Sequence, residues 1–254
     1  MEKFKISLIS YLNSRPFLYG LENSPIKKEI QLFLDIPAKT AVKMAHNLVD
    51  AGLVPVGALP ELSEYRIVSD FCIGADGPVR TVVLASEVPV DQVETILMDY
   101  QSRSTVLLVR VLAHYFWKRE FRWENTCDHF ETESIHGTSA GIVIGDRVFH
   151  IERRYRYIYD LSEEWNKYTG LPFVFAVWAT RKSLPENFLL KFNDALALGI
   201  SGIPEVEKSE QHLYPEVDIY DYFTRNISYL LDDRKKEGMR LFLELSKKLP
   251  AISK

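Results

Sequence analysis

FKISLISYLNSRP, residues 4–16, begins with the pattern of a buried strand and ends in a polar loop. Apolar side chains recur from Phe4 to Leu12, and the polar residues before Pro16 break that pattern. A strand that opens into a polar loop at its carboxyl end is typical of α/β proteins, which bind ligands at that edge of the sheet. The segment therefore indicates an α/β fold, with candidate binding residues directly after the first strand.

The pattern downstream of this segment alternates between strands and helices, as an α/β fold requires. We expect strands over residues 30–36, 53–59, 65–73, 79–86, 95–98, 141–144 and 173–180. We expect helices over residues 39–49, 105–117, 160–168, 186–198 and 237–249.

Composition excludes several classes of protein. The 254 residues include 31 Lys and Arg against 35 Asp and Glu, a net charge of −4, which argues against a nucleic-acid-binding protein. No stretch approaches the roughly 18 consecutive apolar residues of a membrane-spanning helix. The N-terminus lacks the apolar core and cleavage site of a secretory signal, so we expect a cytoplasmic protein with free thiols at Cys72 and Cys127.

Known catalytic signatures are scarce. The sequence contains no GxSxG elbow, Walker loop, GxGxxG turn or HExxH motif, and its six histidines show no metal-ligand spacing. We therefore expect no metal site. The run Ser102-Arg103-Ser104-Thr105 precedes a predicted helix, where main-chain N–H groups and hydroxyls favour an anion. Simple N-capping by one of these hydroxyls is the alternative interpretation.

Four segments together resemble the MqnA family, the chorismate dehydratases of the futalosine route to menaquinone. Together they span most of the first 180 residues, and the last of the four segments is the most specific. The segments are Tyr11–Pro16, Gly74–Thr81, Ser102–Thr105, and Ile144–Asp146 followed by Trp165 and Thr169–Trp178.

The resemblance implies the two-lobed fold of type II periplasmic binding proteins, with the ligand cleft between the lobes. We expect residues 1–83 and 179–254 to form lobe one, and residues 84–178 to form an inserted lobe two. It also implies loss of water from chorismate to give 3-[(1-carboxyvinyl)oxy]benzoate. The substrate is then a small dicarboxylate, and no cofactor, nucleic acid or membrane takes part.

The same resemblance implies which residues act. Asn13 matches the Asn of the family's YLN motif, and Thr81 stands where relatives commonly have Ser, so both are expected to be catalytic. The expected substrate-binding residues are Ser14, Ser102, Arg103, Ser104, Thr105, Gly145, Asp146, Pro172 and Phe173. Asn13 could instead serve the turn before Pro16, and Asp146 could instead cap the segment that follows it.

Three other functions remain open at this point. The 1,4-dihydroxy-6-naphthoate synthase of the same pathway shares the fold, but its family carries a His-based motif where this chain has Gly145-Asp146. A non-catalytic protein that binds small anions would be expected to carry a signal peptide. A ligand-sensing domain of a transcription regulator would be expected to carry a helix-turn-helix segment.

Overall fold

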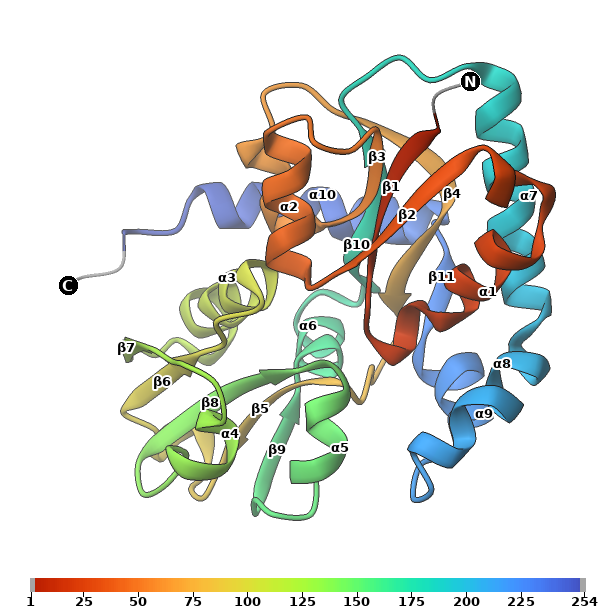
Figure 1. Ribbon diagram of the computed structural model, residues 1–254. Coiled ribbons are helices and arrows are strands. Elements are labelled where there is room, and N and C mark those ends of the chain that lie inside the picture. Colours follow the sequence, from red (N-terminus) through yellow and green to blue (C-terminus); the bar gives the residue numbers. More distant parts are fainter. Residues whose placement is uncertain (1–2, 252–254) are drawn as a thin grey trace. The chain divides into compact units, whose positions relative to one another are not determined.

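The computed structural model describes residues 3–251 and contains two separate β-sheets with covering helices. The chain divides into two compact units. Unit 1 comprises Met1–Gly74 and Val174–Asp233, and unit 2 comprises Ala75–Phe173 and Arg234–Lys254. One sheet belongs to each unit (Figure 1). The predicted α/β class is thus confirmed.

The sheet of unit 1 has six strands in the order β11-β4-β10-β3-β1-β2. Strand β1 pairs in parallel with β2 and β3, whereas β10 runs antiparallel to β3, and β11 antiparallel to β4. The strands are β1 Phe4–Ile9, β2 Ile30–Asp35, β3 Ala51–Pro55, β4 Arg66–Ala75, β10 Phe173–Thr180 and β11 Ser228–Leu230. The helices are α1 Arg15–Asn23, α2 Pro37–Ala45, α7 Glu186–Ser201, α8 Ile203–Glu210 and α9 Ile219–Asp221.

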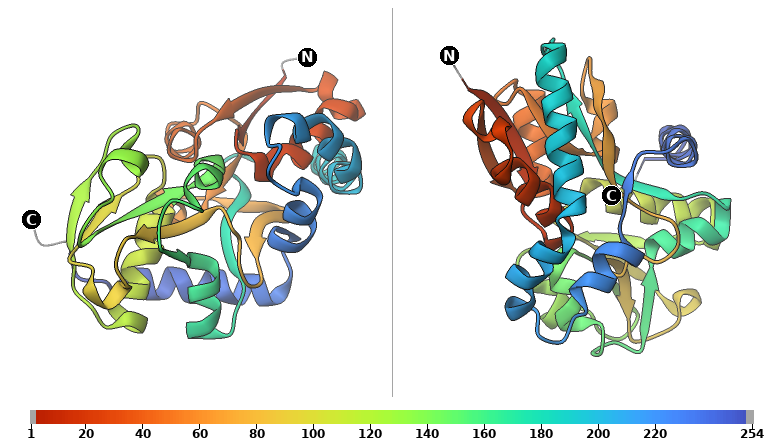
Figure 2. Two further views of the ribbon diagram at one scale, coloured as in Figure 1. Left: turned by 90° about the horizontal axis from the view of Figure 1, so that it is seen from below. Right: turned by 90° about the vertical axis from the view of Figure 1, so that its right-hand side faces the viewer.

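Helices α1 and α7 pack against each other at unusually short range (Figures 1 and 2). A Cβ atom on Gly20 of α1 would lie 1.9 Å from the carbonyl oxygen of Ala195, and one on Gly199 of α7 would lie 2.0 Å from that of Pro16. Both distances are far below van der Waals contact. The two glycines therefore allow the helix backbones to touch where any larger residue would push them apart.

The sheet of unit 2 has five strands in the order β7-β6-β8-β5-β9. Strand β6 is parallel to β7 and β8, and β5 is antiparallel to β8 and β9. The strands are β5 Val82–Ser86, β6 Thr95–Met98, β7 Arg122–Asn125, β8 Ser139–Ile144 and β9 Tyr157–Asp160. The helices are α3 Arg103–Val111, α4 Phe130–Glu133, α5 Val148–Ile151, α6 Leu161–Thr169 and α10 Asp233–Lys247.

The C-terminal helix α10 completes an aromatic cluster in unit 2. Phe242 of α10 is fully buried, and its ring centroid lies 5.0 Å from that of Phe173 and 6.1 Å from that of Trp165. All three contacts in this cluster are edge-on, including the 5.5 Å pair of Trp165 and Phe173, as aromatic rings prefer. Residues 234–247 therefore belong to the core of unit 2, although they lie far from it in sequence.

The compact units differ from the expected lobes at their boundaries. The chain leaves unit 1 at Gly74, within β4, rather than after residue 83, because β5 pairs on both sides with strands of unit 2. It returns to unit 1 at Val174 rather than at residue 179. Helix α10, expected in lobe one, packs in unit 2. Thr81, which was expected in lobe one, consequently lies in unit 2.

The local predictions are mostly confirmed. Strands β6 and β10 have the expected bounds, whereas the helix expected over residues 105–117 is α3 followed by a π-helical turn, Leu112–Trp117. This turn ends at Lys118, which has a left-handed φ of 54°. Strands β7, β9 and β11 were not predicted. Both thiols are free, Cys72 buried and Cys127 exposed.

Candidate functional site

One edge of the sheet in unit 2 gathers most of the predicted site residues. Thr81 directly precedes β5, whose first residue pairs with Ile144 at the end of β8. Gly145 follows β8 with a left-handed φ of 66°, and its main-chain N–H donates to the carbonyl oxygen of Thr81 at 2.8 Å. Thr81 and Gly145 are therefore neighbours, and Asp146 follows, half-buried.

The run Ser102–Thr105 begins at the same edge. Strands β6 and β8 are parallel neighbours, so their carboxyl ends meet there, and β6 leads into α3. The Ser102 hydroxyl accepts a hydrogen bond from the Thr105 N–H at 3.2 Å and lies 2.8 Å from the Thr105 hydroxyl. Ser102 is thus the N-cap of α3. Ser104 and Thr105 are buried, whereas Arg103 is exposed.

An ion pair between a buried carboxylate and a half-buried guanidinium joins these two strand ends. The Arg147 guanidinium, two residues after Gly145, lies 2.5 Å from the carboxylate of Asp99, which directly follows β6. The other Asp99 oxygen accepts from the Gln101 N–H at 2.7 Å. Burial raises the pKa of Asp99, although Arg147 and the Gln101 N–H oppose that shift. The ion pair therefore links the segment between β6 and α3 to the turn that follows β8.

A half-buried carboxylate, that of Asp160, fixes the backbone directly before Thr81. Asp160, the last residue of β9 and the N-cap of α6, accepts hydrogen bonds from the N–H groups of Arg80, Ser162 and Glu163 at 2.6, 3.0 and 3.1 Å. Burial raises the pKa of Asp160 in spite of these donors. Arg80 has a left-handed φ of 67°, so the Asp160 bond holds an uncommon backbone turn directly before Thr81.

Asn13 and Ser14 lie in unit 1, in a 3-10 turn (Leu12–Ser14) that follows β1. The Ser14 hydroxyl donates to the side-chain oxygen of Asn13 at 3.0 Å, and Ser14 itself is buried. The first strand thus opens into a polar turn as the sequence predicts, at the carboxyl end where α/β proteins place ligands.

Pro172 and Phe173 pack in the core of unit 2. Both are buried; the carbonyl oxygen of Pro172 accepts a hydrogen bond from the Trp165 indole at 3.3 Å, and the Phe173 ring lies in the aromatic cluster of unit 2. Both residues therefore contribute to the packing around Trp165 in unit 2.

Several residues that hold the candidate site residues in place are not predicted from the sequence. Asp99, Arg147 and Asp160 act through part-buried hydrogen bonds. The only sign of Asp99 and Asp160 in the sequence is an acidic residue at the end of a strand, and Arg147 has no such sign. The phenol of Tyr229 in β11 donates to the main-chain oxygen of Asn13 at 3.0 Å. That contact joins residues 216 positions apart, so no local pattern could indicate it.

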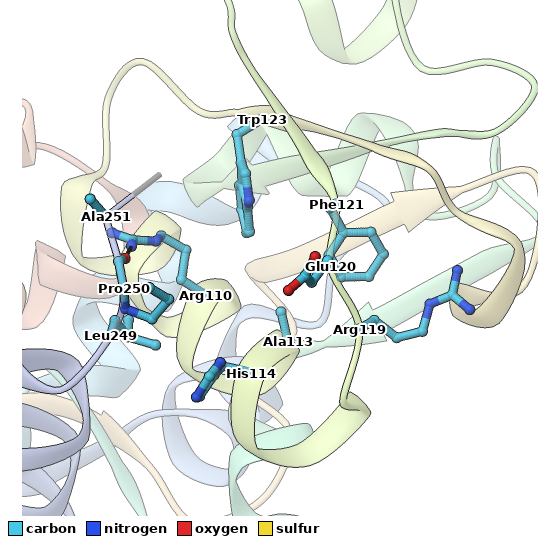
Figure 3. Close-up of a pocket in the computed structure, with 10 residues that line it drawn as sticks. All are labelled: Arg110, Ala113, His114, Arg119, Glu120, Phe121, Trp123, Leu249, Pro250 and Ala251. Carbon is cyan, nitrogen blue, oxygen red and sulfur yellow. Dashed lines mark hydrogen bonds between the residues drawn. The ribbon is translucent and has the colours of Figure 1, made fainter. Parts of the chain in front are cut away.

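A cavity of about 210 Å³ lies at the other end of α3 (Figure 3). It contains none of the predicted site residues, and its lining comes from α3, the π-helical turn, β7 and the chain after α10. The lining residues are Arg110, Ala113, His114, Arg119, Glu120, Phe121, Trp123, Leu249, Pro250 and Ala251.

The described residues contain neither a cluster suited to a metal ion nor a helix suited to a membrane. Within residues 3–251, no three His, Cys, Asp or Glu side chains are grouped so that they could hold a metal ion. Over the same residues, no helix has both the length and the apolar character needed to cross a membrane.

Solved structures define the class of fold. A protein of Archaeoglobus fulgidus matches with a TM-score of 0.74 at 15% identity, over 96% of this chain and 97% of that one. A Candida albicans protein described as having the generic periplasmic binding protein fold gives 0.69 at 15% identity, over 99% and 92%. The alkanesulfonate-binding protein of Xanthomonas axonopodis gives 0.67 at 10% identity, over 98% and 95%. The chain thus has a two-lobed, periplasmic-binding-protein-like α/β fold.

Sequence comparison then identifies the family. A family model described as menaquinone biosynthesis matches residues 4–248, and the chain belongs to this family. Among curated proteins, the chorismate dehydratase of Thermus thermophilus is 32% identical over 88 residues. That match spans 34% of this chain and only 32% of the relative's length. The predicted family membership is confirmed.

Proposed function

We propose that the protein is a chorismate dehydratase, which removes water from chorismate to give 3-[(1-carboxyvinyl)oxy]benzoate. The observation that carries the proposal is the family match over residues 4–248, supported by the partial match to a named chorismate dehydratase. The polar edge in unit 2 supports it further, because the substrate has two carboxylates and the start of α3 offers a helix N-terminus with buried hydroxyls.

The reaction needs little from the protein beyond binding and orientation. The C–O bond to the ring hydroxyl breaks, the adjacent ether-bearing carbon loses its proton, and that C–H electron pair becomes a ring double bond. Hydroxide and proton leave together as water. Because the ring becomes aromatic, holding the substrate in a reactive geometry accounts for much of the catalysis.

Each site residue then has a proposed role. The start of α3 binds one substrate carboxylate through Ser104 and Thr105, with the positive end of the helix dipole behind them. Asn13 donates its side-chain amide to the departing hydroxyl, since its amide oxygen already accepts from Ser14. Thr81 offers its hydroxyl to the reacting ring, and Gly145 keeps Thr81 in place through the 2.8 Å main-chain bond.

The test is direct. Purified protein is incubated with chorismate while ultraviolet spectra are recorded, and the product mass is measured. We expect the spectrum of a substituted benzoate and a product lighter than chorismate by one molecule of water. Unchanged chorismate with folded protein would overturn the proposal. Binding without conversion would favour a non-catalytic protein that binds small anions.

A further inference from the structure

The phenol of Tyr229 is bonded to the same residue that we propose to be catalytic. Its hydroxyl donates to the main-chain oxygen of Asn13 at 3.0 Å, from β11 at the edge of the sheet in unit 1. Tyr229 is only 6% exposed, whereas Asn13 is half-buried, so water has little access to the donor side of this bond. A buried phenol that loses its acceptor is left unsatisfied, which makes the bond a strong constraint on the turn.

Asn13 is held from two sides. The Ser14 N–H donates to the carbonyl oxygen of Tyr11 at 3.0 Å, which closes the 3-10 turn, and the Ser14 hydroxyl engages the side-chain oxygen of Asn13. Tyr229 adds the bond to the main-chain oxygen of Asn13. The backbone and the side-chain oxygen of Asn13 are therefore both fixed, which also limits where its amide nitrogen can lie.

The ring of Tyr229 is itself immobilised by the aromatic core of unit 1. Its centroid lies 5.3 Å from that of Phe17, in an edge-on arrangement, and Phe17 packs in the same way against Trp178 at 5.8 Å. Burial, and to a lesser degree Tyr222, raises the pKa of Tyr229 well above its usual value. The phenol therefore remains a proton donor over the whole neutral range.

We propose that Tyr229 is a positioning residue for Asn13: its buried phenol fixes the peptide of the Leu12–Ser14 turn and thereby aims the Asn13 amide. This inference rests on the proposed function, since it presumes that Asn13 acts on the substrate. Tyr229 does not contact the reacting atoms in this role. It acts by limiting how far the amide can move, and small displacements of a catalytic group are costly to turnover.

The test compares two buried phenols that make the same kind of bond. Tyr229→Phe keeps the ring and removes only the hydroxyl. The matched control is Tyr155→Phe, because the Tyr155 hydroxyl donates to the main-chain oxygen of Glu131 at 2.7 Å and Tyr155 is buried to a similar degree. We expect about a 10-fold lower kcat in Tyr229→Phe with KM changed less than about 2-fold, and kcat in Tyr155→Phe within about 2-fold of wild type.

A double-mutant cycle makes the result specific. If Tyr229 acts through Asn13, then Tyr229→Phe lowers kcat no further once Asn13→Ala is present. Additive losses, or an unchanged kcat in Tyr229→Phe, would overturn the proposal. NMR gives a readout independent of turnover: the Asn13 side-chain amide resonances should broaden or split in Tyr229→Phe and not in Tyr155→Phe. Absence of turnover in the wild type would overturn the proposed function, whereas unaltered resonances would overturn the positioning role.

Discussion

Ser102 and Ser104 lie two residues apart at the start of α3. We expect Ser102 to stabilise the helix and Ser104 to bind the substrate. Ser102 caps the helix, so Ser102→Ala should lower the free energy of unfolding by about 1 kcal/mol. Ser104→Ala removes a buried hydroxyl from the proposed carboxylate site and should raise KM about 10-fold or more, because charge-assisted bonds are the stronger ones. Urea unfolding and steady-state kinetics on both variants separate the two effects. An unchanged KM in Ser104→Ala would show that residues 102–105 only cap α3 and do not bind the substrate.

Asn13 and Thr81 are expected to affect turnover more than binding. Asn13→Ala should lower kcat by about 10²- to 10³-fold, the usual loss when one well-placed donor is removed. Thr81→Ser should be nearly silent because it keeps the hydroxyl, whereas Thr81→Val should lower kcat, since Val has the same shape without that hydroxyl. Kinetics on the three variants would decide the matter. Near-normal kcat in both Asn13→Ala and Thr81→Val would make these residues structural.

At the scale of elements, the crossing of α1 and α7 should be intolerant of any side chain. Gly20→Ala places a methyl group 1.9 Å from a main-chain oxygen, which cannot rotate away as a side chain would. We expect a loss of about 3 kcal/mol or more in the free energy of unfolding. Glu22→Ala, at an exposed position of the same helix, is the control and should change it by less than about 0.5 kcal/mol. Equal effects of the two variants would contradict the close crossing.

The cap of α6 should make stability depend on pH. Because the pKa of Asp160 is raised above its ordinary value of 3.8, the folded state binds the proton more readily than the unfolded chain. Its contribution is therefore present below 3.8 and is lost as the pH rises through the folded-state pKa. Asp160→Asn removes this titration and adds a constant penalty, since its NH₂ group would face an N–H donor.

The measurement is urea unfolding of wild type and Asp160→Asn from about pH 3 to about pH 7. The stability of the wild type relative to the variant should fall with rising pH in the window above 3.8. Two parallel curves would show that Asp160 does not titrate differently in the folded protein.

How far the sequence predicts an element depends on how apolar and how long it is. Strands β6 and β10 are apolar runs with the expected bounds, whereas β7 is Arg122–Asn125, with a single apolar residue, and lies at an edge of its sheet. Strand β11 has three residues and depends on its partner β4. The turn at Asn13 could be predicted from its residues, but the bond from Tyr229 could not, because it arises only when the sheet forms.

At the scale of the molecule, the C-terminal helix is expected to stabilise unit 2 in particular. Phe242→Ala would leave a cavity against Trp165 and Phe173, and we expect it to cost about 3–5 kcal/mol. Hydrogen exchange followed by mass spectrometry should then show faster exchange in residues 75–173 and little change in residues 3–74. Leu198→Ala on α7 in unit 1 is a contrasting surface control, because that side chain is 40% exposed. Exchange that accelerates equally in both units would contradict the assignment of α10 to unit 2.

The position of β10 in its sheet has a consequence for biosynthesis on the ribosome. Strand β10 lies between β4 and β3, so until residues 173–180 emerge, the N-terminal strands of unit 1 cannot form one continuous sheet. The sheet of unit 2 is complete earlier, since its last strand ends at Asp160. During synthesis, β3 and β4 each present an unpaired edge while roughly a hundred further residues are added at about 5–20 residues per second. The nascent chain is thus expected to need holdase chaperones for its earliest-made segment, residues 4–75.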